Sequence, residues 1–388
     1  MKARLSLLKT IMLGSLAFSC TSYADVQQPI IESYAKHAQY LDIKISPEGT
    51  YLASTSRSED GLISLTVLDI KKQEVVSITR GRGKESVSTF NWLNDDRLLL
   101  TMAREVGSFE QPLPTGELIA MNADGSDSTI LTGWRSESGD KRFSQIVDYL
   151  PSDPDAVVVY SVDLTAREPY LDLYKMKVSN GRKSGMGRMP LRRYAGSGAG
   201  VITGTNGNVL AMFNSDPNED NKQTLIVRSS PESDWYTAYE AGAYDPFFQP
   251  LVFLADNKTL VGLSTIETDT QALATFNVDT KKHTVLYAHD KVDVSPIVHV
   301  QNGQVREVQG ASFEYLGIDS VFLEGVQYSE DQKILASLTN TFKGQMVQAT
   351  SSTNDTNQMI FRVGNANNPT VFYLFDKSAR KLVKLAET

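Results

Sequence analysis

The chain has 388 residues, of which 41% are hydrophobic and 22% charged, and its formal net charge is −8. This acidic balance excludes a nucleic-acid partner held by charge, because such binding depends on lysine and arginine side chains that neutralise phosphates. The length exceeds that of a common single domain, so the sequence holds either two domains or one repeat architecture.

The first 24 residues have the pattern of a secretory signal peptide. Basic Lys2, Arg4 and Lys9 precede an apolar run at 10–20, and small residues lead up to Ala24. The run is shorter than the roughly 20 residues that cross a bilayer, which disfavours the alternative of a membrane anchor. Bulky Phe18, two residues before Cys20, and the lack of a leucine at the usual place disfavour a lipoprotein signal. We predict cleavage after Ala24 and a periplasmic or secreted protein without a membrane span.

Cleavage would leave residues 25–388 as the mature chain. It would hold 35 basic and 46 acidic side chains, a net charge of −11, and no cysteine. The absence of thiols excludes disulfides, thiolate catalysis and zinc–sulfur sites. The charge is typical of a soluble exported protein.

Short runs rich in β-branched and aromatic residues recur along 25–388, separated by Gly, Asn, Asp and Ser. They form seven groups, which begin near residues 41, 88, 145, 200, 249, 296 and 346. A spacing of roughly 50 residues is close to that of one four-stranded propeller blade. Arg97–Thr101 and Val157–Tyr160 are apolar on both faces, as strands sandwiched between neighbouring blades must be. The sequence predicts an all-β fold, a β-propeller of seven four-stranded blades.

One helix interrupts this pattern, predicted at 329–342. Ser329 and Gln332 form a capping-box pattern, and Gly344 follows as a stop signal. Four apolar residues fall on one helical face: Ile334, Leu335, Leu338 and Phe342. We expect the helix to pack on the propeller surface; the alternative is a partner-binding helix.

The sequence lacks the Gly-x-Ser-x-Gly motif of α/β-hydrolases, in which a sharp turn leaves no room for side chains beside the nucleophile. The nearest matches surround Ser197 and Ser312, in β-rich sequence with no helix after them. The four histidines show no metal-binding spacing, and the neighbours His289 and Asp290 are predicted to be a loop pair. We therefore assign no catalytic, cofactor-binding or metal-binding residue, and we expect no serine seated beside a histidine and an acid.

Asp216, Asn218 and Asp220 alternate as the oxygen donors of a calcium loop do. Asn221 stands where such a loop needs glycine, and Val227 where it needs glutamate, so we predict an exposed hairpin loop instead.

Two further groups of residues have structural interpretations. Arg192 and Arg193 are predicted to be a solvated pair, although they have the chemistry to meet a carboxylate. Trp92, Trp134 and Trp235 recur at blade-like positions, and we predict that they belong to the core.

Several phrases, in this order and spacing, resemble the N-terminal propeller of prolyl-oligopeptidase-type serine peptidases, closest to the acylaminoacyl-peptidase-like branch. They are Ile45–Ala53 (ISPEGTYLA), Phe90–Leu98 (FNWLNDDRL), Tyr149–Asp155 (YLPSDPD), Tyr170–Val178 (YLDLYKMKV) and Phe372–Asp376 (FYLFD). The resemblance covers the chain from about Tyr40 to Leu385.

In that family the propeller caps a C-terminal α/β-hydrolase domain, which contains the serine nucleophile and its Asp and His partners, and it limits access to short peptides. The resemblance therefore implies ancestry and shape, and no position of this chain inherits a catalytic role from it. A propeller without its hydrolase would expose an apolar face, so we expect self-association or a bound partner.

Three hypotheses follow. The first is a non-catalytic propeller that binds a peptide or protein, since propellers present loops around an axial channel. The second is the substrate-gating part of a peptidase that is truncated or assembled with a separately encoded hydrolase. The third is a scaffold in an envelope complex, similar to the propeller of the TolB type.

Overall fold

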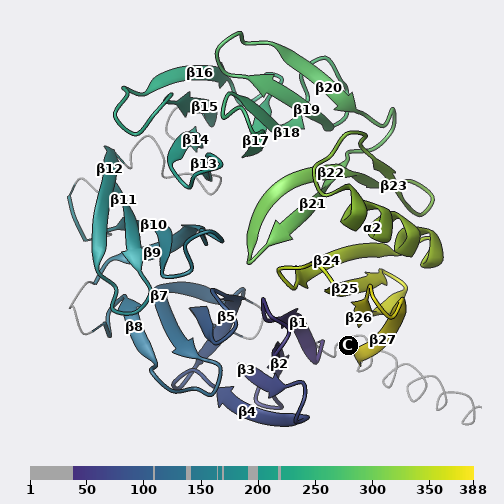
Figure 1. The fold of residues 1–388 in the computed structure, drawn as a ribbon. Helices are drawn as coiled ribbons and strands as arrows, with labels where there is room; N and C mark the ends of the chain where they lie inside the picture. The colour runs from purple at the N-terminus through teal and green to yellow at the C-terminus, as the bar shows by residue number, and fades with distance from the viewer. Residues whose placement is uncertain are drawn as a thin grey trace, which may run out of the picture. The chain divides into compact units, whose positions relative to one another are not determined.

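Seven antiparallel sheets follow one another along the chain and stand in a ring around a central axis (Figure 1). The computed structural model describes residues 38–388 apart from 108–109, 137–140, 164, 168–169, 191–199 and 217–219. The predicted signal peptide lies outside this described part. Within it, no helix has the length and apolar character needed to cross a membrane.

Each blade is built from strands that are consecutive in sequence, with the first strand nearest the axis. Blade 1 contains β1 (Tyr40–Ile45), β2 (Tyr51–Arg57), β3 (Ile63–Asp69) and β4 (Glu74–Thr79). Blade 2 contains β5 (Glu85–Trp92), β6 (Arg97–Arg104), β7 (Leu113–Asn122) and β8 (Thr129–Thr132). Blade 3 contains β9 (Phe143–Asp148), β10 (Ala156–Val162), β11 (Tyr170–Lys177) and β12 (Lys183–Pro190). Blade 4 contains β13 (Gly200–Thr203), β14 (Val209–Asp216), β15 (Lys222–Val227) and β16 (Tyr236–Ala241).

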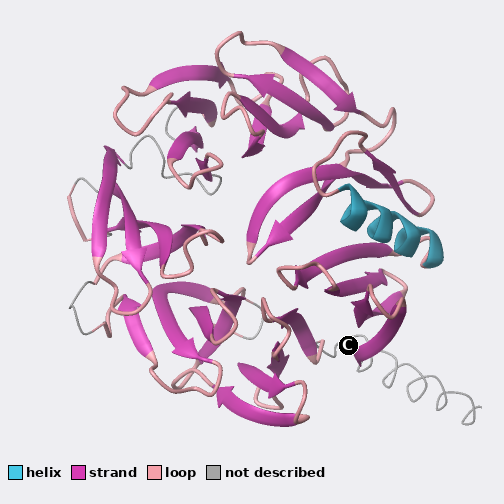
Figure 2. Cartoon of the chain, viewed as in Figure 1, coloured by secondary structure: helices cyan, strands magenta, loops and turns pink. Residues whose placement is uncertain are grey.

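The second half of the ring contains the helix. Blade 5 contains β17 (Phe248–Phe253), β18 (Thr259–Ser264), β19 (Ala272–Asn277) and β20 (His283–Tyr287). Blade 6 has three strands, β21 (Ser295–Gln301), β22 (Gln304–Glu314) and β23 (Ile318–Phe322), followed by helix α2 (Ser329–Thr341; Figure 2). Blade 7 contains β24 (Met346–Ser352), β25 (Gln358–Asn365), β26 (Asn368–Asp376) and β27 (Lys381–Glu387). The predicted seven-bladed propeller is confirmed, and six of its blades have the predicted four strands.

Apolar layers fill the spaces between blades because central strands are apolar on both faces. In β6, Leu98 and Leu100 pack toward blade 1, whereas Leu99 packs toward blade 3. In β10, Val158 packs toward blade 4, and Val157 packs toward blade 2. One such cluster lies at each of the seven blade interfaces. The two-faced apolar strands predicted from the sequence are thus confirmed.

The runs recognised in the sequence omitted the outermost strand of four blades, namely β4, β12, β16 and β23. These strands lie at the rim; the burial pattern of β4, for example, contains no buried position. A strand exposed on its outer edge needs no regular apolar alternation, so its sequence carries a weak signal.

Helix α2 occupies its predicted range and packs Leu335 and Leu338 into the interface between blades 6 and 7. The predicted capping box is wrong: Tyr328 is the N-cap, and no side chain caps the helix. The Gln332 side chain instead donates hydrogen bonds to the carbonyl oxygens of Gln309, at 2.9 Å, and Leu323, at 2.6 Å. Tertiary contacts of blade 6 have therefore replaced the local cap.

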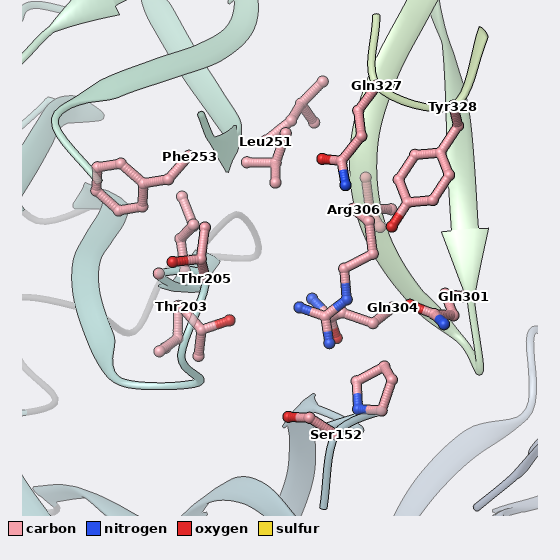
Figure 3. Close-up of a pocket in the computed structure, with 16 residues that line it drawn as sticks. Ser152, Thr203, Thr205, Leu251, Phe253, Gln301, Gln304, Arg306, Gln327 and Tyr328 are labelled. Atoms are coloured by element: carbon pink, nitrogen blue, oxygen red, sulfur yellow. The ribbon is translucent and has the colours of Figure 1, made fainter. Parts of the chain in front are cut away.

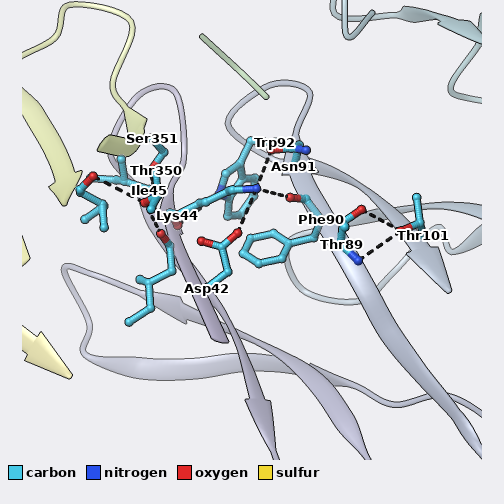
Figure 4. Close-up of polar contacts among 12 residues, drawn as sticks. Asp42, Lys44, Ile45, Thr89, Phe90, Asn91, Trp92, Thr101, Thr350 and Ser351 are labelled. Atoms are coloured by element: carbon cyan, nitrogen blue, oxygen red, sulfur yellow. Dashed lines mark hydrogen bonds and ion pairs between the residues drawn. The ribbon is translucent and has the colours of Figure 1, made fainter. Parts of the chain in front are cut away.

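Blade 7 closes the ring against blade 1 without exchanging a strand (Figure 4). The Ile45 backbone N–H donates to Ser351 Oγ at 2.9 Å, and the Thr350 hydroxyl donates to the Ile43 carbonyl oxygen at 2.7 Å. Ile43 and Ile45 pack with Ile360 and Phe372. Closure depends on these side-chain hydrogen bonds and on apolar burial.

The antiparallel order of strands gives the propeller two distinct faces. The turns after the first and third strands of each blade open on one face, which we call the upper face. The turns after the second strands and the connections between blades open on the other, the lower face.

Candidate functional site

A cavity of about 300 Å³ opens on the upper face, among the ends of the innermost strands (Figure 3). Its walls come from the turn after β9, the ends of β13 and β17, the β21–β22 hairpin and the segment before α2. Four consecutive blades, 3 to 6, therefore line one hollow. Its volume lies at the lower end of the range typical of small-ligand sites.

Arg306, near the start of β22, reaches into this cavity. Its Nη2 donates to Asp148 Oδ1 at 3.2 Å. Asp148 is fully buried at the end of β9 and also accepts hydrogen bonds from the Thr203 hydroxyl and from the Leu150 backbone N–H. Three donors thus satisfy a carboxylate that would be costly to bury alone. The same contacts tie blades 3, 4 and 6 together beside the cavity.

The other polar groups that line the cavity are neutral. Among the described lining residues, Arg306 is the only charged one. Figure 3 shows amides, hydroxyls and an apolar wall around it, formed by Gln301, Gln304, Gln327, Ser152, Thr203, Thr205, Leu251 and Phe253. Amides and hydroxyls both donate and accept hydrogen bonds, so the lining suits a ligand with peptide-like polar groups and an apolar part.

The β21–β22 hairpin crosses the axis of the ring (Figure 1). Its two-residue turn, Asn302 and Gly303, has positive φ at both positions, as the preferred hairpin turn requires. Gly303 lies against Asn91 of β5, in blade 2, so the tip spans from blade 6 to the far side of the ring. The hairpin therefore occupies the axis next to the cavity.

Asn91 is held firmly where it receives the hairpin. Lys44 Nζ donates to its Oδ1 at 2.8 Å, and its Nδ2 donates to the Tyr149 hydroxyl at 2.7 Å. Burial raises the pKa of Tyr149 to about 12, so this hydroxyl stays protonated at neutral pH. The Asn91 side chain, fixed on blade 2, is thus the surface against which the hairpin tip packs.

A second hollow, of about 320 Å³, lies between β23 and the nearby strands of blade 7. Met346, Gln348 and Arg362 are among its lining residues. It adjoins the part of blade 6 that has no fourth strand. All of its polar lining groups belong to blade 7, whereas four blades contribute to the lining of the axial cavity.

The expectation that no serine lies beside a histidine and an acid is wrong. His283 Nε2 lies 3.0 Å from Ser264 Oγ, and His283 Nδ1 lies 3.9 Å from Glu267 Oε2. Ser264 ends β18 and His283 begins β20, the two strands that flank β19, so the sheet of blade 5 brings together residues 19 positions apart. Sequence reasoning missed this cluster because it has no motif of fixed spacing.

The geometry of this cluster opposes nucleophilic catalysis. Ser264 is fully buried, and its hydroxyl donates to the Phe247 carbonyl oxygen at 3.0 Å. While its single proton is donated to Phe247, Ser264 Oγ can only accept from His283 Nε2, the reverse of the direction in which a general base works. His283 Nδ1 is buried without a hydrogen-bond partner, and burial lowers the pKa of His283. The cluster is a structural feature of blade 5.

Ser312, His289 and Asp290, which belong to the described part of the chain, lie apart from the cavity. Ser312 is buried in β22 and faces the Ser295 carbonyl oxygen at 3.5 Å. His289 and Asp290 form the predicted loop pair; the Lys291 backbone N–H donates to His289 Nδ1 at 3.2 Å. Ser197, Arg192, Arg193, Asn218 and the side chain of Asp216 lie outside the described residues.

The three tryptophans differ in their environments. Trp92 is buried between blades 1 and 2, and Trp235 packs on the cluster between blades 3 and 4. Trp134 is 64% exposed, so its predicted core position is wrong. It lies after β8 in a connection between blades, where the Lys141 ammonium sits 5.0 Å from its ring centroid.

Sequence reasoning also missed Arg306 and Asp148. Asp148 follows the apolar pair Ile146-Val147 at the end of its strand, and Arg306 lies between Val305 and Glu307 near the start of its strand. A charge near the axis of a propeller must be paired or must face a ligand, and this signal could have identified them.

No protein-family model and no curated protein matches the sequence. Solved structures match its fold. A prolyl endopeptidase aligns over 90% of this chain and 50% of its own, with a TM-score of 0.52 and 10% identity. The β-propeller domain of the Trilobed protease from Pyrococcus furiosus aligns over 90% and 96%, with a TM-score of 0.52 and 9% identity. A puromycin hydrolase aligns over 91% and 54%, with a TM-score of 0.51 and 10% identity.

These matches agree with the resemblance found in the sequence. The chain spans about half the length of the prolyl endopeptidase and of the puromycin hydrolase. It spans nearly all of the isolated protease propeller. The chain therefore has the fold of the β-propellers found in prolyl-oligopeptidase-type peptidases.

Proposed function

We propose that this chain is a non-catalytic propeller that binds a short peptide, or a short segment of a protein, in the axial cavity. The observation that carries the proposal is the convergence of four blades on one hollow lined by Arg306, neutral amides and hydroxyls, and an apolar wall. Such a lining matches the donors, acceptors and side chains of a peptide.

The position of the β21–β22 hairpin supports a gating role as part of the same proposal. Its tip occupies the axis and rests on Asn91, so a peptide in the cavity would meet the hairpin before passing along the axis. We propose that the hairpin limits passage along the axis to ligands that displace it. The N-terminal signal pattern supports the proposal that the protein works in the periplasm or outside the cell.

Peptide binding is tested by blocking the cavity without removing a contact that holds it together. Ser152 is exposed at its rim, so Ser152→Trp would fill the hollow. The matched control is Ser184→Trp, at an exposed position of outer strand β12. We expect randomised tripeptides to bind wild type and Ser184→Trp, as measured by affinity selection and mass spectrometry, and binding to be lost in Ser152→Trp. Equal binding to all three proteins would overturn the proposal.

A second candidate function is the substrate-gating part of a split or truncated peptidase. The half-length alignment with a prolyl endopeptidase favours it. An adjacent reading frame that encodes Gly-x-Ser-x-Gly followed by Asp and His would support this candidate. Its absence would favour a free-standing binder.

The lower face is the place where a partner domain would find apolar surface. Eight of the 14 large apolar side chains that are exposed in the described part lie in its connections or at the strand ends next to them. They are Val106, Leu113, Trp134, Tyr170, Tyr244, Tyr315, Leu316 and Met346. Self-association or partner binding stays a prediction, checked by light scattering after size exclusion. A monomer that binds no hydrophobic dye would contradict it.

A further inference from the structure

We propose that Arg306 forms a subsite for a single carboxylate, so that the peptide bound in the axial cavity carries a free C-terminus or an acidic side chain at that point. This inference rests on the proposed function and names the ligand chemistry of the same cavity.

The described lining of the cavity carries a single positive charge. Arg306 is the only charged residue among the described residues that line the cavity. A lone guanidinium surrounded by neutral amides and hydroxyls favours a ligand group that carries one negative charge. A phosphate dianion would keep one uncompensated negative charge beside this single guanidinium. The net charge of −8 on the whole chain disfavours such a ligand further.

Arg306 has more N–H donors than its contact with Asp148 uses. A guanidinium has five N–H donors, and the one hydrogen bond that Arg306 makes within the described part goes to Asp148. Its side chain is 19% exposed, and Figure 3 shows the guanidinium directed into the hollow. Nitrogen atoms on the cavity side are therefore placed to meet a carboxylate with two parallel hydrogen bonds.

Asp148 fixes the orientation of the Arg306 guanidinium. This carboxylate is fully buried and also accepts bonds from the Thr203 hydroxyl and the Leu150 N–H, so its charge is shared among three donors. Asp148 holds the guanidinium in one orientation and leaves its other edge free for a ligand. A preorganised donor loses little side-chain entropy on binding.

The surroundings of Arg306 match the remainder of a peptide that ends on it. Gln304 offers an amide group beside the guanidinium, Gln327 offers another farther along the same wall, and Leu251 and Phe253 form the apolar wall across the cavity (Figure 3). A carboxylate on Arg306 would place the neighbouring peptide group among the amides and a side chain toward the apolar wall.

The test compares three pools of N-acetylated tripeptides with the same randomised sequences, by affinity selection and calorimetry at pH 7. The first pool has free C-termini, the second has C-terminal amides and no acidic residue, and the third has C-terminal amides and one glutamate. We expect wild type to bind the first or the third pool at least tenfold more tightly than the second, as a charge-assisted pair predicts. The pool that binds identifies the source of the carboxylate.

Variants locate this preference. Arg306→Gln should bind acid and amide pools equally. Because this change leaves Asp148 buried without its cation, the double variant Asp148→Asn, Arg306→Gln provides a folded control without a buried charge, checked by circular dichroism. Arg362→Gln alters an exposed arginine at the second hollow and should keep the wild-type preference.

Two outcomes would overturn the inference. Equal binding of the three pools to wild type removes the carboxylate subsite and leaves peptide binding intact, whereas binding of none of them removes the proposed function as well. A preference that survives in the double variant, or that is lost in Arg362→Gln, would also contradict the assignment to Arg306.

Discussion

Gly303 at the tip of the β21–β22 hairpin is packed so closely against Asn91 that a Cβ at position 303 would lie 2.5 Å from Asn91 Cγ. Residues 212 positions apart thus meet across the axis of the ring. The contact requires glycine for two reasons: it leaves no room for a Cβ, and φ at Gly303 is +83°, which residues with side chains rarely adopt.

Substitution Gly303→Ala should therefore cost more stability than an ordinary glycine replacement. Gly61 is a matched control: its φ is +85°, and nothing lies within 4 Å of a Cβ added there. We expect Gly61→Ala to lower the free energy of unfolding by about 1 kcal/mol through backbone strain, and Gly303→Ala by about 3 kcal/mol through strain plus overpacking. Urea unfolding measures both values. Equal costs would show that the hairpin tip does not rest on blade 2.

The ring closure should be weakened by loss of its side-chain hydrogen bonds. Ser351→Ala and Thr350→Val each remove one bond to β1, at an expected cost of about 1 kcal/mol. Thr101→Val removes a comparable bond, to the Thr89 backbone N–H within blade 2 (Figure 4). Hydrogen exchange of Ile43 and Ile45 should accelerate in the first two variants and stay unchanged in the third. Unchanged protection in all three would mean that the hydrogen bonds of Ser351 and Thr350 do not hold the ring closed.

His299 should make the protein less stable in mild acid. It is buried in β21, its ring stacks on Tyr328 at 3.8 Å between centroids, and burial lowers its pKa to about 4. An unfolded histidine takes up its proton near pH 6.5, so the free energy of unfolding should fall as the pH drops from about 6.5 to about 4. The loss should reach about 3 kcal/mol and level off below that range.

The neighbouring carboxyl group acts in the opposite direction. Asp331 Oδ2 lies 3.8 Å from His299 Nδ1, and burial raises the pKa of Asp331, which favours the folded state as the carboxyl takes up its proton. The slope between pH 6.5 and 4 should become much smaller in His299→Gln, where His283 and Asp331 still contribute, and should persist in His289→Gln, a loop histidine. A slope unchanged in His299→Gln would assign it to other groups.

Ser264 should be unreactive toward fluorophosphonate probes, despite its position beside His283. It is fully buried, and its hydroxyl proton is directed to the Phe247 carbonyl oxygen. We expect no labelling by gel fluorescence. Ser264→Ala should instead lower the free energy of unfolding by about 1–3 kcal/mol, because it leaves buried polar groups unpaired. Labelling that disappears in Ser264→Ala would show that blade 5 holds a working nucleophile.

The sequence predicted the parts of the fold that repeat. Two-faced apolar strands such as β6 and β10 must lie between neighbouring blades, and seven groups of strands at regular spacing then specify a ring of blades. Rim strands such as β4 were not recognised in the sequence, because a strand with an exposed edge needs no apolar alternation. Local signals also failed where tertiary contacts dominate, as at Gln332, which binds blade 6 instead of capping α2.

The candidate site could not be read from the sequence for a related reason. Asp148, Thr203 and Arg306 are separated by 55 residues or more and meet only when blades 3, 4 and 6 converge on the axis. The Ser264 and His283 pair likewise depends on the pairing of strands in blade 5. Such clusters have no fixed spacing, so their chemistry appears only in three dimensions.

Photo-crosslinking tests the central claim of axial peptide binding most directly. Tripeptides that carry a photoreactive diazirine side chain are bound to the protein, irradiated, and mapped by mass spectrometry. We predict crosslinks at Leu251, Phe253 and Gln327 of the axial cavity, and their suppression by Ser152→Trp. Crosslinks confined to the second hollow around Met346, or to the lower face around Tyr244 and Leu316, would contradict the claim.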